Sequence, residues 1–276
     1  MQLPGDRTVK LWSSADDWIT SRVWWRGLAG YESETVLPLL RFAETARVVL
    51  DVGAFTGYYS LLAAAMNPDA RVFAFEAHSF LAARIGKNVS LNPGLQVTVM
   101  PYAVCEARGP VDFHYGFHLG PGLPSSSSIG DDWAGRDQTR RVAGLDIDSF
   151  CDEWAVRDVD LVKIDVESRE PEVIAGMRRT IERDRPVIVL EVLDSHRARY
   201  GETEKWLAEH GYRFFALAAD GPSLTQSLVA RSGGAENYLA CPEEKVPPWL
   251  AASAGGDRSA WKTATGGRSL DQQTDA

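Results

Sequence analysis

The segment Val48–Tyr59 contains three residues whose types and spacing could bind a charged ligand: Asp51, Gly53 and Gly57. An apolar run precedes them and a helical pattern follows, which is the order of a strand, a tight turn and a helix. A dinucleotide-binding turn would have a further glycine where Phe55 stands, to cradle a pyrophosphate. The carboxylate of Asp51 would repel a diphosphate and attract a cation. The ammonium and sulfonium groups of S-adenosylmethionine therefore suit this turn better, and a turn that binds no ligand is the alternative interpretation.

Acidic side chains stand at the ends of four apolar runs, namely Asp51, Glu76, Asp165 and Glu191. In an open α/β sheet the ligand binds outside the carboxyl ends of the strands. We therefore predict that these acids share one edge of the sheet and form a site for a cationic cofactor and a protic substrate. Glu76 closes the second strand and is placed to accept hydrogen bonds from both ribose hydroxyls, with a solvated strand end as the alternative.

Strands that alternate with helices over the first two-thirds of the chain predict the elements that position these acids. An antiparallel pair, Tyr212–Leu217 and Asn237–Cys241, closes the pattern. The predicted fold class is α/β, with a Rossmann-like, doubly wound and mainly parallel sheet. An antiparallel strand pair at the end of such a sheet is usual in its class I methyltransferase variant. A single helix is predicted over Glu170–Thr180, because its acidic first turn complements the helix dipole.

The pattern divides the chain into three parts. Residues 1–44 predict an N-terminal helical cap with a ragged arm over residues 1–12, and residues 45–245 predict the α/β domain. Residues 246–276 are rich in Gly, Ala, Ser and Thr, so we predict a disordered tail. Inside the domain, residues 116–138 are rich in Gly, Pro and Ser and predict a flexible flap beside the substrate.

The composition excludes several classes of partner. A net charge of −9 over 276 residues argues against nucleic acid and anionic membranes, because binding them needs clustered Lys and Arg. Three widely spaced cysteines argue against a disulfide framework or a metal finger and favour a cytoplasmic protein. No apolar stretch reaches the length of a transmembrane span, and the N-terminus lacks an apolar signal core. Trp24 and Trp25 would suit the interface of a homo-oligomer.

Three motifs in order, DVGAFTGYYSL, VFAFEAH and VKIDVESRE, resemble the FkbM family of S-adenosylmethionine-dependent methyltransferases. The third is the most telling, because the family usually reads Lys-Ile-Asp-Val-Glu-Gly-x-Glu there. This chain departs from the family pattern at Phe55, where Asn is frequent, at Ala77, where Pro is common, and at Ser168, where Gly is usual. The resemblance covers roughly residues 45–215, within the size range of one domain.

The resemblance implies methyl transfer from S-adenosylmethionine, with S-adenosylhomocysteine as product, to a hydroxyl of a small-molecule natural product or sugar. It implies that Asp51, Gly53 and Gly57 lie at the methionine end of the cofactor, that Glu76 binds the ribose, and that the strand ending at Asp165 faces the methyl group. The residues expected to line the cofactor are Asp51, Gly53, Ala54, Phe55, Gly57, Tyr58, Glu76, Ala77, Tyr102, Ala103 and Asp165.

An alcohol is a poor nucleophile, so a base should accept its proton. The candidates by location are Asp165, Glu167, Glu191 and His196. Lys163 could orient a carboxylate or stabilise an oxyanion, or it could pair with Asp165, whose strand face it shares. Asp165 with Glu191 or Asp194 could hold Mg²⁺, but the spacing does not support a metal site, because the ligands would come from separate strands.

Two other classes of function stay open. A nicotinamide-dependent oxidoreductase could use a similar sheet, although the third glycine is absent and Tyr58 is followed by Leu62 rather than by the Lys of a Tyr-x-x-x-Lys pair. A non-catalytic, cofactor-binding partner subunit would agree with the departures at Phe55 and Ser168. A hydrolase has less support, because the chain has no Gly-x-Ser-x-Gly elbow.

Overall fold

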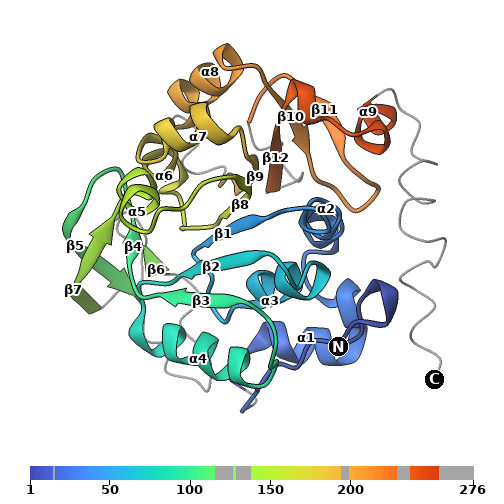
Figure 1. Ribbon diagram of the computed structural model, residues 1–276, viewed down its shortest axis with the longest axis vertical. Helices are drawn as coiled ribbons and strands as arrows, with labels where there is room; N and C mark the ends of the chain where they lie inside the picture. Colours follow the sequence, from blue (N-terminus) through green and yellow to red (C-terminus); the bar gives the residue numbers. More distant parts are fainter. Residues whose placement is uncertain (15, 116–126, 129–137, 194–198, 229–236, 255–276) are drawn as a thin grey trace.

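The computed structural model describes residues 1–14, 16–115, 127–128, 138–193, 199–228 and 237–254 (Figure 1). Its main sheet has the strand order β11-β10-β12-β9-β8-β1-β2-β3. The strands are β1 Val48–Val52, β2 Arg71–Phe75, β3 Val97–Met100, β8 Val159–Ile164, β9 Val187–Glu191, β10 Tyr212–Ala216, β11 Ser223–Thr225 and β12 Asn237–Pro242. The chain order reverses between β1 and β8, and ligands bind at such a switch point.

Five neighbouring strands of this sheet pair in parallel, in the order β9-β8-β1-β2-β3. Strand β12 pairs antiparallel with both β9 and β10. This arrangement confirms the predicted α/β class and the closing antiparallel pair. The short edge strand β11, which pairs with β10, was not predicted from the sequence.

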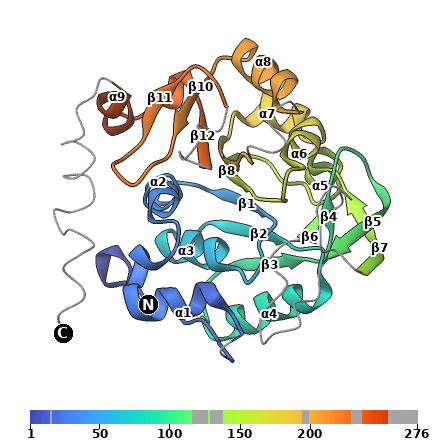
Figure 2. The same cartoon turned by 180° about the vertical axis from the view of Figure 1, so that it is seen from behind.

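Helices cover both faces of the sheet, as Figures 1 and 2 show from opposite sides. The buried side chains of α1, α2, α3 and α9 belong to one apolar cluster, and those of α5 to α8 belong to another. The α-helices are α1 Trp18–Arg26, α2 Ser33–Ala43, α3 Tyr58–Met66, α4 Ser79–Ser90, α5 Ile147–Glu153, α6 Glu170–Ala175, α7 Arg178–Asp184, α8 Gly201–Glu209 and α9 Pro248–Ala254. Short 3-10 turns are η1 Pro4–Asp6, η2 Gly27–Gly30 and η4 Glu243–Lys245.

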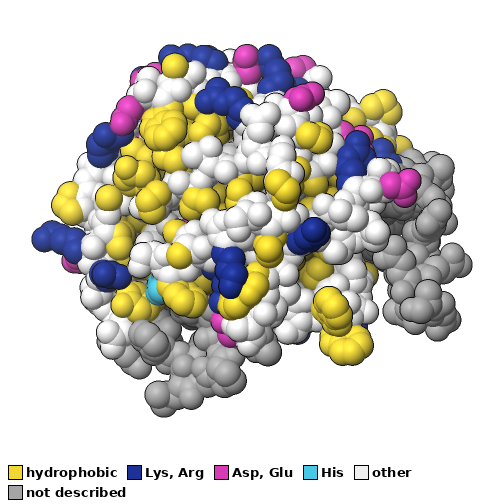
Figure 3. Space-filling view, turned by 60° about the horizontal axis from the view of Figure 1, so that its bottom comes forward, with side chains coloured by type: hydrophobic (Ala, Val, Ile, Leu, Met, Phe, Trp, Pro, Cys, Tyr) yellow, Lys and Arg dark blue, Asp and Glu magenta, His cyan; other side chains and the backbone are white. Residues whose placement is uncertain are grey.

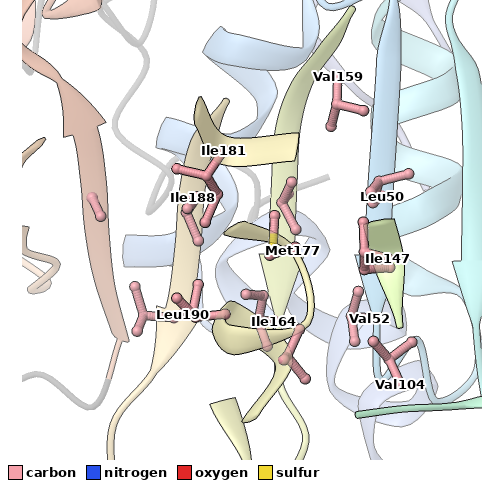
Figure 4. Close-up of a cluster of buried hydrophobic side chains, with 14 of the residues drawn as sticks. Leu50, Val52, Val104, Ile147, Val159, Ile164, Met177, Ile181, Ile188 and Leu190 are labelled. Carbon is pink, nitrogen blue, oxygen red and sulfur yellow. The ribbon is translucent and has the colours of Figure 1, made fainter. Parts of the chain in front are cut away.

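The central strands are apolar on both faces, because each face is buried under helices. Along β1, Leu50 and Val52 join the cluster under α5 to α8, whereas Val49 joins the opposite cluster. Figure 4 shows the cluster under α5 to α8, in which side chains from β1, β8 and β9 meet Met177 and Ile181. This packing fixes the strand register and therefore the positions of the acids that follow the strand ends.

A second sheet, with the order β4-β7-β5-β6, follows β3 in the chain. Its strands are β4 Ala103–Val104, β5 Gly109–Tyr115, β6 Ser127–Ser128 and β7 Gln138–Leu145. The flap expected over residues 116–138 lies outside the described residues except at 127–128 and 138.

The N-terminal arm is ordered rather than ragged. Leu3 and Val9 are buried in the cluster under α1 to α3. The backbone N–H groups of Lys10 and Trp12 donate to the side chains of Asn92 and Asn88 at 2.8 Å and 2.7 Å. The arm is therefore fixed by contacts with residues more than seventy positions away, which its own sequence does not reveal.

One further expectation is corrected by the structure, and another is tested only in part. The helix predicted over Glu170–Thr180 is split into α6 and α7, because the backbone leaves helical angles at Gly176 (ψ 0°) and Met177 (φ −128°). At this break Gly176 packs against the Cys105 carbonyl oxygen, which a Cβ would approach to 2.4 Å. The start of the tail, most of which was predicted to be disordered, contains α9, whose Leu250 is buried and whose Trp249 ring centroid lies 5.6 Å from that of Phe42, so the prediction for the rest stays untested. Residues 255–276 of that tail lie outside the described residues.

Apolar side chains lie among Lys and Arg on the face seen in Figure 3. Trp24 and Trp25 of α1 are 80% and 79% exposed, so the suggested homo-oligomer interface stays a prediction. Among the described residues, no helix has the length and apolar character needed to span a bilayer.

Candidate active site

The turn after β1 requires glycine at two positions. Gly53 has φ +81°, and a Cβ there would lie 1.8 Å from the carbonyl oxygen of Asp165. Gly57 also has φ +81°, and a Cβ there would lie 2.9 Å from Cγ2 of Ile85. Glycine tolerates both the positive φ and the close approach. The turn is thereby pressed against the start of the loop that follows β8, so the two strand ends at the switch point are in direct contact.

Asp51 lies in β1 beneath this turn and is buried. Its carboxylate accepts a hydrogen bond from the Ser60 hydroxyl in the first turns of α3. Burial raises the pKa of Asp51 to about 6, although the Ser60 hydroxyl favours the charged form. A nearby cation would stabilise this carboxylate. Ala54 and Tyr58, also predicted at the cofactor, are buried beside the same turn.

Glu76 fixes the other side of the turn. Its carboxylate accepts the backbone N–H of Phe55 at 2.9 Å and that of His78 at 2.7 Å. Burial raises the pKa of Glu76 to about 7, and the two N–H donors oppose that shift. Each carboxylate oxygen keeps a further lone pair, so Glu76 can still accept hydrogen bonds from a pair of ligand hydroxyls. Ala77, which follows it, is partly exposed.

Tyr102 lies beyond β3 and packs partly buried against the core. Together with Arg108, Arg141 and Leu145 it lines an open hollow of about 500 Å³ at the start of the second sheet. Ala103 is buried and pairs with Gly144 in that sheet. Of these two predicted adenine contacts, Tyr102 is the one that lines this hollow.

On the β8 side of the switch point, Lys163 forms an ion pair with Asp165. The Lys163 ammonium lies 2.9 Å from Asp165 Oδ2, and its side chain is 1% exposed, whereas that of Asp165 is 25% exposed. Burial opposes the charged form, but Asp165, Glu32 and Glu191 together hold the pKa of Lys163 above its ordinary value. The pair predicted from the shared strand face is therefore present, and its carboxylate can be reached from solvent.

Two more carboxyls surround the same lysine. Glu191 ends β9, and burial together with Asp165 raises its pKa well above the usual value while Lys163 opposes the shift. Glu32 enters from the turn before α2, where it accepts the Tyr59 hydroxyl at 2.7 Å and the Asn237 side-chain amide at 3.3 Å. Sequence reasoning gave Glu32 and Asn237 no role in the site, because neither belongs to a local motif and they are 205 positions apart.

The loop after β8 is organised by Glu170. Its buried carboxylate accepts the backbone N–H of Val166 at 3.0 Å and of Ser168 at 3.3 Å, and the Tyr200 hydroxyl also donates to it. Burial raises the pKa of Glu170 to about 7. Glu167 and Ser168 both have left-handed φ values, +57° and +77°. This shape keeps Glu167 close enough to raise the pKa of Glu191.

The remaining predictions concern His196 and Asp194, and both lie outside the described residues. Among the described residues, no group of three or more His, Cys, Asp or Glu side chains is placed to hold a metal ion. Beside Asp165, where such an ion was considered, the Lys163 ammonium supplies the positive charge.

The donor set at this edge of the sheet fits S-adenosylmethionine. Carboxylates gather on both sides of a glycine turn, two of them buried, Asp51 and Glu76, and three partly buried, Asp165, Glu191 and Glu32. Glu76 suits a ribose diol, and the acids around Lys163 suit a cationic group. A pyrophosphate would meet repulsion at the same place. A profile described as the methyltransferase FkbM domain matches residues 51–214, more than half of the chain. The chain belongs to the FkbM methyltransferase family.

Two curated proteins are similar to this FkbM chain. The 2-O-methyltransferase NoeI of Sinorhizobium fredii is 26% identical over 50% of the chain and 60% of its own length. The hexuronic acid methyltransferase AglP of Haloferax volcanii is 28% identical over 59% of the chain and 63% of its own length. The matched segments therefore span less than two-thirds of either relative.

Among solved structures, the methyltransferase FkbM of Methylobacillus flagellatus KT superposes with a TM-score of 0.46 at 14% identity, over 71% of this chain and 43% of that one. The matched FkbM domain contains the turn, Glu76, Lys163 and Asp165, whereas Glu32 and Asn237 lie outside residues 51–214. These two residues thus join the site from flanking segments.

Proposed function

We propose that this protein is an S-adenosylmethionine-dependent O-methyltransferase that acts on a hydroxyl of a small-molecule natural product or sugar. The observation that carries the proposal is the set of buried and partly buried carboxylates on both sides of the glycine turn, at the switch point of an FkbM domain. NoeI and AglP, named for 2-O-methylation and for hexuronic acid methylation, favour a carbohydrate hydroxyl. Family membership argues against the nicotinamide-dependent alternative.

Bound S-adenosylmethionine would supply a methyl group on a sulfonium, which is already a good leaving group. The residues that would hold it are Glu76 at the ribose, Tyr102 at the adenine, and Asp51 with the Gly53 turn at the methionine end. Because Glu76 also fixes the backbone of the turn through Phe55, loss of its carboxylate disturbs both the ribose contact and the shape of the turn. Positioning of this kind supplies much of the rate of a displacement reaction.

For the acceptor, we assign Asp165 as the group that takes the hydroxyl proton. Its carboxylate is partly exposed, whereas its partner Lys163 is buried and keeps a positive charge beside it. Lys163 thereby orients the Asp165 carboxylate toward the acceptor through the 2.9 Å contact. Glu167, Glu191 and His196 are the other candidates for this role, and replacing each in turn would show which one the methyl transfer requires.

The test is calorimetric titration with S-adenosylhomocysteine of the wild type, Glu76→Gln and Asp69→Asn. Glu76→Gln should weaken binding by at least about tenfold, since it removes a charged acceptor of ligand hydroxyls. Asp69→Asn is the control, because Asp69 is an exposed carboxyl just before β2, at the amino ends of the strands and therefore away from the site. Absence of binding to the wild type at millimolar ligand would overturn the proposed function.

A further inference from the structure

Glu32 places a carboxylate at the active site from outside the FkbM domain. It is the N-terminal cap of α2 and has φ +39°, a left-handed conformation that non-glycine residues seldom adopt. Its carbonyl oxygen accepts the backbone N–H groups of Thr35 and Val36, both at 2.9 Å. The first turn of α2 therefore holds the backbone of Glu32 in place.

The side chain of Glu32 connects two elements of the site. It accepts the hydroxyl of Tyr59, in the first turn of α3, and the amide of Asn237, at the start of β12. Tyr59 in turn presents its ring to Lys163, whose ammonium lies 5.1 Å from the ring centroid. Asn237 stands opposite Glu191 in the register of β12 and β9. Glu32 thus belongs to the same buried group as Lys163, Asp165 and Glu191.

This group carries more acids than bases. Three carboxyls, those of Glu32, Asp165 and Glu191, interact with the one buried ammonium of Lys163. Burial raises the pKa of Glu32, and Lys163 opposes the shift. The titratable groups that face Glu32 from neighbouring elements are Tyr31, Tyr58, Tyr59, Lys163 and Asp165. Those that face Glu191 are Asp165, Lys163, Glu167 and Glu170. The net charge of the group therefore becomes more negative as these acids ionise.

Two buried polar atoms beside Glu32 lack a partner among the described residues. They are the hydroxyl of Tyr58 and Oδ1 of Asn237, in side chains that belong to residues 2% and 5% exposed. A buried oxygen without a donor is costly unless a ligand or an ordered water supplies one. The amide oxygen of Asn237 only accepts, so it favours a positively charged neighbour, as the excess of carboxyls does.

The position of the group relates it to the cofactor turn. Gly53 touches the backbone of Asp165, and Tyr59 follows Gly57 at the start of α3. Since Glu76 lies on the far side of the turn, toward β2, the acids around Lys163 border the end of the site opposite to the ribose. This inference rests on the proposed function, in which the sulfonium joins the ribose at Glu76 to the methionine end at the Gly53 turn, beside the backbone of Asp165.

We propose that Glu32 is a specificity-determining residue that makes the site favour the positively charged S-adenosylmethionine over its neutral product S-adenosylhomocysteine. The two ligands differ by one methyl group and one positive charge. A carboxylate near the sulfonium attracts that charge across several ångströms of poorly solvated protein. The same preference would help the product leave after methyl transfer.

The experiment measures the dissociation constants of both ligands by calorimetry, at about pH 6 and about pH 8, and compares their ratios. In the wild type, S-adenosylhomocysteine should bind about tenfold more weakly than S-adenosylmethionine. This ratio should be at least as large at the higher pH, since burial raises the pKa of Glu32. Glu32→Gln should reduce the ratio severalfold. Glu32→Asp, which keeps the charge, should restore most of it. An analogue with an ammonium in place of the sulfonium should bind like S-adenosylmethionine.

Glu34→Gln is the matched control, since it makes the same change two residues away, where the carboxylate accepts the Ser33 hydroxyl at 3.4 Å. A second readout is proton release, from binding heats in two buffers of different ionisation enthalpy. S-adenosylmethionine should displace more protons than S-adenosylhomocysteine, because its charge favours ionised carboxyls.

An unchanged ratio in folded Glu32→Gln would overturn the inference and leave the proposed function intact. Failure of both ligands to bind the wild type would overturn the proposed function, and the inference with it. If Glu32→Gln does not fold, a wild-type ratio close to one at both pH values, together with equal proton release, would overturn the inference.

Discussion

At the scale of single residues, Ser168 occupies a conformation that its side chain disfavours. It is buried with φ +77°, where the family usually has glycine. A non-glycine residue there costs about 1–2 kcal/mol, and glycine loses part of that gain through its freer unfolded chain. We expect Ser168→Gly to raise the free energy of unfolding by about 0.5–1 kcal/mol in urea titration.

Ser168→Ala provides the comparison for this prediction. Alanine keeps the Cβ and therefore the backbone strain, so it should give no such gain. If Ser168→Gly were no more stable than Ser168→Ala, the positive φ would not be the source of the strain.

The residues that sequence reasoning predicted correctly belong to local motifs. Gly53 and Gly57 were expected from their spacing, and the Lys163–Asp165 pair from a shared strand face, and the structure has both. Glu32 and Asn237 were not predicted as site residues, because a hydrogen bond across 205 positions leaves no periodic signal. The ligand contacts assigned to all of these residues stay predictions until binding is measured.

At the scale of elements, the N-terminal arm and α4 together hold the glycine turn after β1. Asn88 of α4 is fully buried, accepts the Trp12 N–H at 2.7 Å and donates to the Thr56 carbonyl at 2.8 Å. Asn88→Ala would leave a buried N–H and a buried carbonyl without partners, each worth about 1–3 kcal/mol. We expect a loss of about 2–4 kcal/mol of stability in thermal or urea unfolding, with weaker S-adenosylhomocysteine binding.

Ser90→Ala, on an exposed side of the same helix, is the control and should change stability by less than about 0.5 kcal/mol. Equal stability of Asn88→Ala and Ser90→Ala would contradict the role given to the arm.

The same arm shows why some elements could not be predicted. Strands and helices of the sheet follow from hydrophobic periodicity, which is a local property. The order of residues 1–12 depends on Asn88 and Asn92, and the break between α6 and α7 is where Gly176 packs against the carbonyl of Cys105. Such contacts form only in the folded chain, so the sequence pattern of either segment does not contain them.

At the scale of the whole molecule, buried carboxyls should make stability fall as the pH rises. Burial raises the pKa values of Asp51, Glu76 and Glu170 to about 6, 7 and 7. A group whose pKa is higher in the folded state holds its proton more tightly there. Its contribution is therefore greatest below the unfolded pKa and is lost as the pH rises toward the folded pKa. The window for this loss runs from about pH 4.5 to about pH 7.

Glu170→Gln should flatten this dependence. Between about pH 5 and about pH 7 the wild type should lose about 2 kcal/mol more stability than the variant, measured by urea titration at each pH. Glu209→Gln, an exposed carboxyl on α8, is the control and should keep the wild-type slope. The ion-paired Asp16, whose pKa is lowered to about 2 by Arg84, acts only at more acidic pH. Identical slopes in Glu170→Gln and wild type would contradict the role of burial at Glu170.

The hydrogen bond between Glu32 and Asn237 also has a consequence for synthesis on the ribosome. A nascent chain that has emerged as far as β9 already contains the glycine turn, Lys163 and Asp165, yet Asn237 has still to be translated. Until β12 arrives, β9 has an open, apolar edge, and such edges pair readily with other chains. Chains truncated between β9 and β12 therefore contain most of the FkbM domain but keep this unpaired edge, which makes them prone to aggregate and in need of chaperones.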